Sequence, residues 1–240
     1  MSSPKYQRVL LKISGEVLGG KNGGLDYEAI NSVASQIAQA AETGIDLAIV
    51  VGGGNIIRGV DAQNFGVART TADYMGMLAT VINSLALQAV LEDRYNLQTR
   101  IQSAIKVSSV AEDFIRRRAI RHLEKKRIVI FAAGTGNPYF STDTAAVLRA
   151  IEIQANLMIK ATKVDGVYDK DPKKYADAKK FESITYREVL DRRLQVMDST
   201  AIALCVDNHL PIMVLNIFEQ GHIVDAILGK TVGTLIHTGE

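Results

Sequence analysis

Four stretches of glycine, hydroxyl-bearing and lysine residues follow short apolar runs, and their residue types suit phosphate binding. They are 12–15 (Lys-Ile-Ser-Gly), 52–55 (Gly-Gly-Gly-Asn), 134–143 (Gly-Thr-Gly-Asn-Pro-Tyr-Phe-Ser-Thr-Asp) and 160–168 (Lys-Ala-Thr-Lys-Val-Asp-Gly-Val-Tyr). Glycine lets backbone N–H groups approach a phosphate closely. Lysine adds a full positive charge where phosphoryl oxygens carry negative charge. Together the four stretches predict a binding site for a polyphosphate.

Asp143 follows Thr142 at the expected start of a helix. The free N–H groups of a helix start, and the positive end of its dipole, favour a bound phosphate. A carboxylate there can also hold two lysines apart, so we expect Asp143 to lie between Lys12 and Lys160, since all three lie at strand ends. Two interpretations of Asp198 stay open: it orients a lysine or a metal ion, or it caps the helix that follows.

Each of these features has an ordinary structural explanation when it is taken alone. Three glycines after a strand make a tight turn, and Ser141 with Thr142 suits a helix cap. Lys12 alone would be a surface lysine at a strand end, and Asp73 alone would be a solvated residue on a helix. The phosphate-binding interpretation rests on their coincidence at several strand ends, which separate structural needs would not produce together.

Short β-branched runs alternate with longer helical stretches along the chain. The pattern predicts strands at 9–13, 45–51, 100–103, 128–132, 157–161, 212–216 and 234–237, and helices at 27–42, 71–95, 111–124, 142–154, 186–190, 198–208 and 221–228. Several strands are apolar on both faces, which is typical of a parallel sheet covered by helices. We therefore predict an α/β fold: a three-layer αβα sandwich around a mostly parallel central sheet, in a single domain over 1–240.

The same architecture explains where the chemistry should lie. Ligands of such sheets bind beyond the carboxyl ends of the strands, which is where the four stretches are expected. The polar stretch 163–180 is longer than an ordinary connection and is predicted to be a functional loop.

Composition limits the class of protein. The chain has 240 residues, 47% hydrophobic and 22% charged, with a net charge of +2 and one cysteine. This excludes an internal disulfide framework and disfavours nucleic acid as the main partner. No stretch approaches the roughly 18 uninterrupted apolar residues of a membrane helix, and the polar N-terminus lacks a secretory signal, so we expect a cytoplasmic protein. The basic segment 116–127 is a solvated or subunit-facing helix, an anionic effector site or a nucleic-acid contact.

Some familiar phosphate motifs are missing from the sequence. There is no Gly-x-x-x-x-Gly-Lys-Ser/Thr motif, and neither glycine stretch extends to Gly-x-Gly-x-x-Gly. The protein-kinase signatures are absent as well. An enzyme that transfers phosphate with this sequence would use another fold.

The same stretches resemble, in order and over nearly the whole chain, the bacterial uridylate kinase family of the amino-acid-kinase superfamily. The resemblance rests on 11–16, 51–55 with 58–59, 73–80, 134–138 with 142–143, 160–168 and 196–198. It implies transfer of the γ-phosphoryl group of ATP to UMP with Mg²⁺, in a homohexamer. It also suggests GTP and UTP as regulatory ligands, with 19–25, Arg100 and Arg127 as a candidate effector region. The metal ligands stay unknown.

Carried over position by position, the resemblance implies three sets of residues. ATP would contact Lys12, Ile13, Ser14, Gly15, Gly54, Arg58, Thr162, Tyr168 and Asp171. UMP would contact Gly53, Asp73, Thr135, Gly136, Asn137, Pro138, Tyr139, Phe140, Ser141 and Thr142. Catalysis would involve Lys12, Asp143, Lys160 and Asp198. The chemistry agrees, because a carboxylate such as Asp73 can accept from two ribose hydroxyls and an aromatic ring such as Tyr168 can cover a purine.

Two other interpretations remain. A related kinase could phosphorylate the carboxylate of acetylglutamate or aspartate, but it needs a site for an amino-acid backbone, and aspartate kinases usually carry a regulatory extension as well. A non-catalytic nucleotide-binding or storage protein could share the fold, but it would not need Lys12, Asp143 and Lys160 together.

Overall fold

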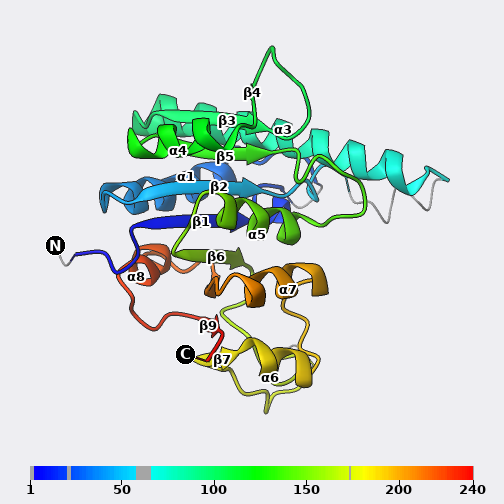
Figure 1. The fold of residues 1–240 in the computed structure, drawn as a ribbon, viewed down its shortest axis with the longest axis vertical. Helices are drawn as coiled ribbons and strands as arrows, with labels where there is room; N and C mark the ends of the chain where they lie inside the picture. The colour runs from blue at the N-terminus through cyan, green and yellow to red at the C-terminus, as the bar shows by residue number, and fades with distance from the viewer. Residues whose placement is uncertain (1–2, 21–22, 58–65, 173, 240) are drawn as a thin grey trace.

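A mostly parallel nine-stranded sheet forms the centre of the protein (Figure 1). The computed structural model describes residues 3–20, 23–57, 66–172 and 174–239. The strands are β1 (Arg8–Ile13), β2 (Asp46–Val51), β3 (Thr99–Ser103), β4 (Glu112–Asp113), β5 (Ile128–Ala132), β6 (Leu157–Thr162), β7 (Ser183–Thr185), β8 (Ile212–Asn216) and β9 (Thr234–His237). Their order is β4-β3-β5-β2-β1-β6-β8-β9-β7, and only the β8–β9 pair is antiparallel.

Helices cover both faces of this sheet. The described helices are α1 (Tyr27–Glu42), α3 (Arg69–Tyr95), α4 (Arg116–Glu124), α5 (Thr142–Glu152), α6 (Tyr186–Asp191), α7 (Ser199–Asp207) and α8 (His222–Ile227), with a 3₁₀ turn η1 (Gly15–Val17) after β1. Because successive strand residues point to opposite faces, Leu11 and Ile49 join the core under α1, α3 and α8, whereas Leu10 and Val50 join the core under α4 to α7. The predicted three-layer αβα sandwich is confirmed.

The sheet register brings the candidate lysines together. β1 lies between β2 and β6, and the parallel register sets Lys12 of β1 beside Lys160 of β6. The loops that follow β1, β2, β5 and β6 therefore meet at one edge of the sheet, at the carboxyl ends of its parallel strands. In Figure 1 the N-terminal part of α3 extends beyond that edge.

Helix α3 is the longest helix of the described part and one wall of the candidate site. It ends at Tyr95, and the left-handed backbone of the next residue, Asn96, lets the Asn96 N–H bond carbonyls of the last turn. By length and composition it could cross a membrane, with an 18-residue window of mean hydropathy 1.5, but half of that window is buried in the protein. Its buried face includes Met77, Leu87 and Leu91, which pack in the same core as α1.

The predicted strands are confirmed with their ends within one residue, but the prediction missed β4 and β7. The helix predicted over 111–124 is wrong in its first part, because α4 begins only at Arg116. Glu112–Asp113 instead adds an edge strand beside β3, and Phe114 packs edge-on against Phe131 with ring centroids 5.6 Å apart. The described residues of the stretch 163–180 are irregular, as expected, apart from one bridge between Tyr168 and Lys180.

Gly233 lies where the chain that enters β9 passes very close to β8. Its φ of +74° is left-handed, and an added Cβ would lie 2.0 Å from the carbonyl oxygen of Val214. Gly44 has a φ of +79° with nothing within 4 Å, so it shares the backbone cost without the clash. We expect Gly44→Ala to lower the free energy of unfolding by about 1 kcal/mol and Gly233→Ala by about 3 kcal/mol or more. Denaturant titration measures both, and equal losses would contradict the close approach.

Candidate active site

Asp143 lies between two lysines at the carboxyl edge of the sheet. Lys12 Nζ is 2.9 Å from its Oδ1, and Lys160 Nζ is 2.6 Å from its Oδ2. Their side chains are only 11% to 16% exposed. Lys160 also donates to the carbonyl oxygen of Val196, at 2.6 Å. The structure thus confirms the expected contact of these three side chains.

The charged groups of this cluster shift one another's pKa values. Burial raises the pKa of Asp143, but Lys12 and Lys160 outweigh that effect, so this pKa lies below its ordinary value. Burial lowers the pKa of Lys160, and although Asp143 opposes the effect, this pKa also lies below its ordinary value. Asp143 is therefore ionised at neutral pH. Two lysines around one carboxylate leave an excess of positive charge that suits an anion.

The glycine stretches after β1 and β2 are in direct contact. A Cβ at Gly15 would lie 2.6 Å from the carbonyl oxygen of Gly52 and 2.7 Å from the N of Gly54, so any larger residue would push the loops apart. Within the described residues, the N–H groups of Gly53 and Gly54 donate to no other backbone group. Successive unpaired N–H groups in one turn favour a bound anion.

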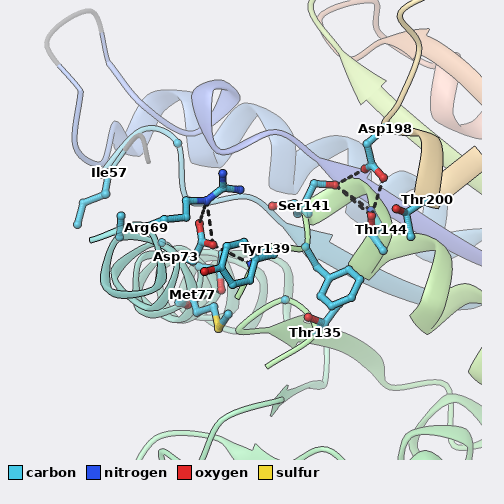
Figure 2. Close-up of a pocket in the computed structure, with 18 residues that line it drawn as sticks. Ile57, Arg69, Asp73, Met77, Thr135, Tyr139, Ser141, Thr144, Asp198 and Thr200 are labelled. Carbon is cyan, nitrogen blue, oxygen red and sulfur yellow. Dashed lines mark hydrogen bonds and ion pairs between the residues drawn. The ribbon is translucent and has the colours of Figure 1, made fainter. Parts of the chain in front are cut away.

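A first pocket of about 470 Å³ lies between α3 and the loop after β5. Figure 2 shows Arg69, Asp73 and Tyr139 at one end of it and Ser141, Thr144 and Asp198 gathered at the other. Its volume is in the range of small-molecule sites.

Asp73 is held firmly at the first end of this pocket. Arg69 Nε lies 3.0 Å from each carboxylate oxygen, and the backbone N–H of Tyr139 donates to Oδ2 at 2.8 Å. The side chain of Asp73 is 18% exposed. The interpretation of Asp73 as an ordinary solvated residue is therefore wrong. Tyr139 has a φ of +74°, an uncommon value for a non-glycine residue, and the bond to Asp73 helps to hold it.

Asp198 closes the other end of the pocket by joining two helix starts. It caps α7 by accepting from the N–H of Ala201 at 3.0 Å, and it accepts from the hydroxyls of Ser141 and Thr144 at the start of α5. Burial raises its pKa, but these hydrogen bonds bring the pKa below its ordinary value. The capping interpretation is confirmed. The sequence had suggested the cap but not the two hydroxyl partners.

A second pocket, of about 560 Å³, lies beside β6 and the irregular stretch after it. Its lining includes Lys160, Thr162, Tyr168 and Asp171. Lys160 therefore belongs to the second pocket, while Thr142, next to its partner Asp143, belongs to the first. The lysine–aspartate–lysine cluster thus links residues of the two pockets.

Comparison with known proteins agrees with this geometry. The model of the amino acid kinase family matches residues 7–216. The chain belongs to the amino acid kinase family.

Solved structures of UMP kinases resemble this chain over nearly all of its length. The UMP kinase of Bacillus anthracis is 40% identical, with a TM-score of 0.96 over 98% of this chain and 97% of that one. The UMP kinase of Ureaplasma parvum is 39% identical, with a TM-score of 0.92 over 98% and 100%. The uridylate kinase of Archaeoglobus fulgidus is 29% identical, with a TM-score of 0.74 over 95% and 99%. This amino acid kinase is thus a phosphate-transferring enzyme.

Most of the predicted site residues of this amino acid kinase gather around the two pockets. The first pocket is lined by Gly53, Gly54, Asp73, Thr135, Tyr139, Phe140, Ser141, Thr142 and Asp198. Gly136, Asn137 and Pro138 belong to the same loop without lining it, and Ile13, Ser14 and Gly15 lead from β1 into η1. Arg58 lies outside the described residues. The prediction missed Arg69, although an arginine four residues before Asp73 is a common ion-pair spacing on a helix.

Replacing Asp143 tests the charge balance of the kinase cluster. Asp143→Asn leaves two lysines facing each other, so we expect the free energy of unfolding at neutral pH to fall by about 3 kcal/mol. Folding lowers the pKa of Asp143. Its contribution to the free energy of unfolding is therefore complete above the unfolded pKa of about 4, and it is lost as the pH falls through the folded pKa. The difference in free energy of unfolding between wild type and Asp143→Asn should therefore narrow below about pH 4.

Asp225→Asn is the control for this prediction, because it removes the surface pair with Lys230 and should change the free energy of unfolding by less than about 1 kcal/mol. Denaturant titrations from neutral to acid pH give all values. A gap between wild type and Asp143→Asn that stays constant down to low pH would contradict the proposed charge balance.

Proposed function

We propose that this protein transfers the γ-phosphoryl group of ATP to UMP, giving ADP and UDP for pyrimidine nucleotide synthesis. The observation that carries the proposal is the largely buried lysine–aspartate–lysine cluster, which links residues of two pockets. A transferase needs such an arrangement because donor and acceptor must meet at a point where negative charge is stabilised. The names of the similar UMP kinases support UMP as the acceptor.

We assign UMP to the first pocket. Asp73 is fixed by Arg69 and Tyr139 and can accept from the two ribose hydroxyls. The acceptor phosphate would lie at the start of α5, where the first-turn N–H groups of Thr142 and Asp143 have no helical partner. Gly53 and the loop 135–142 would complete its surroundings.

We assign ATP to the second pocket and to the glycine loops. Thr162, Tyr168 and Asp171 line a space suited to a nucleoside, and the hydroxyl of Tyr168 is held by Asp165 at 2.7 Å. The phosphates would extend toward Lys12, Ser14, Gly15 and Gly54, with backbone N–H groups and one ammonium group as donors. The assignment of Ile13 and Arg58 to ATP stays a prediction.

The reaction would be a direct transfer. A phosphate oxygen of UMP forms a bond to the γ-phosphorus while the bond from that phosphorus to the bridging oxygen of ADP breaks. The acceptor phosphate is largely ionised at neutral pH, so no strong base is needed. Lys12 and Lys160 would stabilise the charge on the transferred group, and Asp143 would keep both lysines apart and correctly aimed.

Mg²⁺ fits this site as an ion carried mainly by the nucleotide phosphates. Within the described residues no group of three or more histidine, cysteine, aspartate or glutamate side chains could hold a metal. The nearby Asp143 is engaged with two lysines and Asp198 with three hydrogen bonds. Mg²⁺ bound by phosphates needs few protein ligands, and it would neutralise part of the charge of ATP.

We also propose that the enzyme is a cytoplasmic homohexamer of single-domain subunits, with GTP and UTP as regulatory ligands. Tyr74, Leu78 and Ile82 are each nearly half exposed and lie one turn apart on α3, which supports contact between copies. The exposed Arg116, Arg117 and Arg118 at the start of α4 support an anionic effector.

An acceptor panel tests the proposed reaction. UMP, CMP, dTMP, acetylglutamate and aspartate are offered with MgATP in a coupled assay for ADP. We expect UMP to give the highest kcat/KM, and preference for any other acceptor would overturn the proposal. Lys12→Ala, prepared in the same way, should lower kcat by about 10² to 10³, because it removes one preorganised donor. A near-normal kcat in this variant would remove Lys12 from the mechanism.

Asp73→Ala tests the assignment of the first pocket. It removes two charge-assisted hydrogen bonds to the ribose, so we expect the KM for UMP to rise by about 10- to 100-fold and the KM for ATP to change much less. Asp191→Ala is a matched control, because Asp191 pairs with Arg187 at the same helical spacing on the exposed face of α6. Steady-state kinetics with each substrate varied in turn gives both constants. Equal increases in the KM for UMP and the KM for ATP would show that Asp73 does not bind the acceptor specifically.

A further inference from the structure

Two asparagines form a reciprocal amide pair beneath the glycine loops. Asn83, on α3, is fully buried, and Asn55, after β2, is 9% exposed. Asn83 Nδ2 donates to Asn55 Oδ1 at 2.7 Å, and Asn55 Nδ2 donates to Asn83 Oδ1 at 3.0 Å. Buried amides are costly unless they are hydrogen-bonded, and here each satisfies the other.

Each amide also holds a backbone carbonyl. Asn83 Nδ2 donates to the carbonyl oxygen of Gly52 at 2.6 Å, and Asn55 Nδ2 donates to that of Gly24 at 2.8 Å. The N–H of Gly24 returns a bond to the carbonyl oxygen of Asn55 at 2.8 Å. The pair therefore ties α3 to the glycine loop after β2 and to the chain that enters α1.

The bond to Gly52 determines where the next N–H points. The carbonyl of Gly52 and the N–H of Gly53 belong to one planar peptide group and point in opposite directions. While Asn83 holds the carbonyl, the N–H of Gly53 keeps one direction. Gly53 itself is confined by α3, since an added Cβ would lie 2.7 Å from the carbonyl oxygen of Gly76.

The loop after β1 depends on the same pair. A Cβ at Gly15 would lie 2.7 Å from Asn55 Oδ1, so this loop packs directly on the amide. One turn before Asn83 on α3, the hydroxyl of Thr80 accepts from the N–H of Ala133, just before the loop that begins at Gly134. Neighbouring positions of one helix face thus hold the loops on both sides of the first pocket.

We propose that Asn55 and Asn83 are positioning residues for phosphoryl transfer. Neither would touch a substrate; together they keep the N–H group of Gly53 aimed at a bound phosphate. This inference rests on the proposed kinase function. An N–H that must turn toward its target during the reaction stabilises the transition state less than one already aimed. Loss of the pair should therefore lower kcat more than it raises either KM.

Asn83→Leu tests this directly, because leucine has a similar size but cannot donate to Gly52. We expect kcat to fall about 100-fold, with less than about a fivefold rise in KM for UMP and ATP. Asn55→Ala leaves the bond from Asn83 to Gly52 in place, so kcat should fall about tenfold. The double variant should be close to Asn83→Leu alone, because both residues act through one contact.

Tyr186→Phe is the matched structural control. Its buried hydroxyl donates to the carbonyl oxygen of Leu210 at 2.7 Å, away from both pockets. This variant should lower the melting temperature while kcat stays within about twofold of wild type. All kinetics are run well below the melting temperature of each variant, with folding checked by circular dichroism.

The outcomes separate the positioning role from the proposed kinase reaction. If Asn83→Leu folds and its kcat stays within twofold of wild type, the positioning role is overturned, even if its melting temperature falls. If Asn83→Leu does not fold, Asn55→Ala decides by the same criterion. If the acceptor panel identifies another acceptor than UMP, the proposed reaction fails. The kcat of each variant relative to wild type, measured with that acceptor, still decides the role of the asparagines.

Discussion

The attraction between Asp143 and its two lysines is the interaction on which the site depends. The parallel pairing of β1 with β6 sets Lys12 and Lys160 beside each other, which would be unfavourable for two like charges with little exposure to water. A carboxylate has to lie between them, and α5 supplies it in its first turn. The sheet topology thus creates the concentration of positive charge, and the start of one helix makes it stable. A bound polyphosphate would neutralise the charge that remains.

The start of α5 does more than supply this carboxylate. Ser141 caps the helix by accepting from the N–H of Thr144, and its hydroxyl in turn donates to Asp198, the cap of α7. Two helix starts are therefore held together next to the first pocket. Because the first-turn N–H groups keep a fixed direction, a phosphate bound there would meet aligned donors and the charge of Lys12 and Lys160 at the same time.

The sequence predicted the parts of the protein whose pattern is local. Strands buried on both faces stand out as apolar runs, so the existence and the ends of β1, β2, β5, β6 and β8 could be predicted. β4 and β7 could not, because two or three residues carry no periodicity and pair only with distant segments. The first five residues of the helix predicted at 111–124 failed for a different reason: their apolar spacing fits a helix, but contacts with β3 and Phe131 extend the chain.

The supports of the site were the least predictable. Glycine and lysine stretches indicate a phosphate site by their residue types, but Thr80 and Asn83 look like ordinary members of a long helix. Their contacts become evident only when α3 lies against the loops after β2 and β5. The two pockets have different linings, yet the loops around the first and the glycines assigned to the donor phosphates rest on this same helix. A single rigid element can therefore keep donor and acceptor groups in register, which a reaction that depends on positioning requires more than it requires any further reactive side chain.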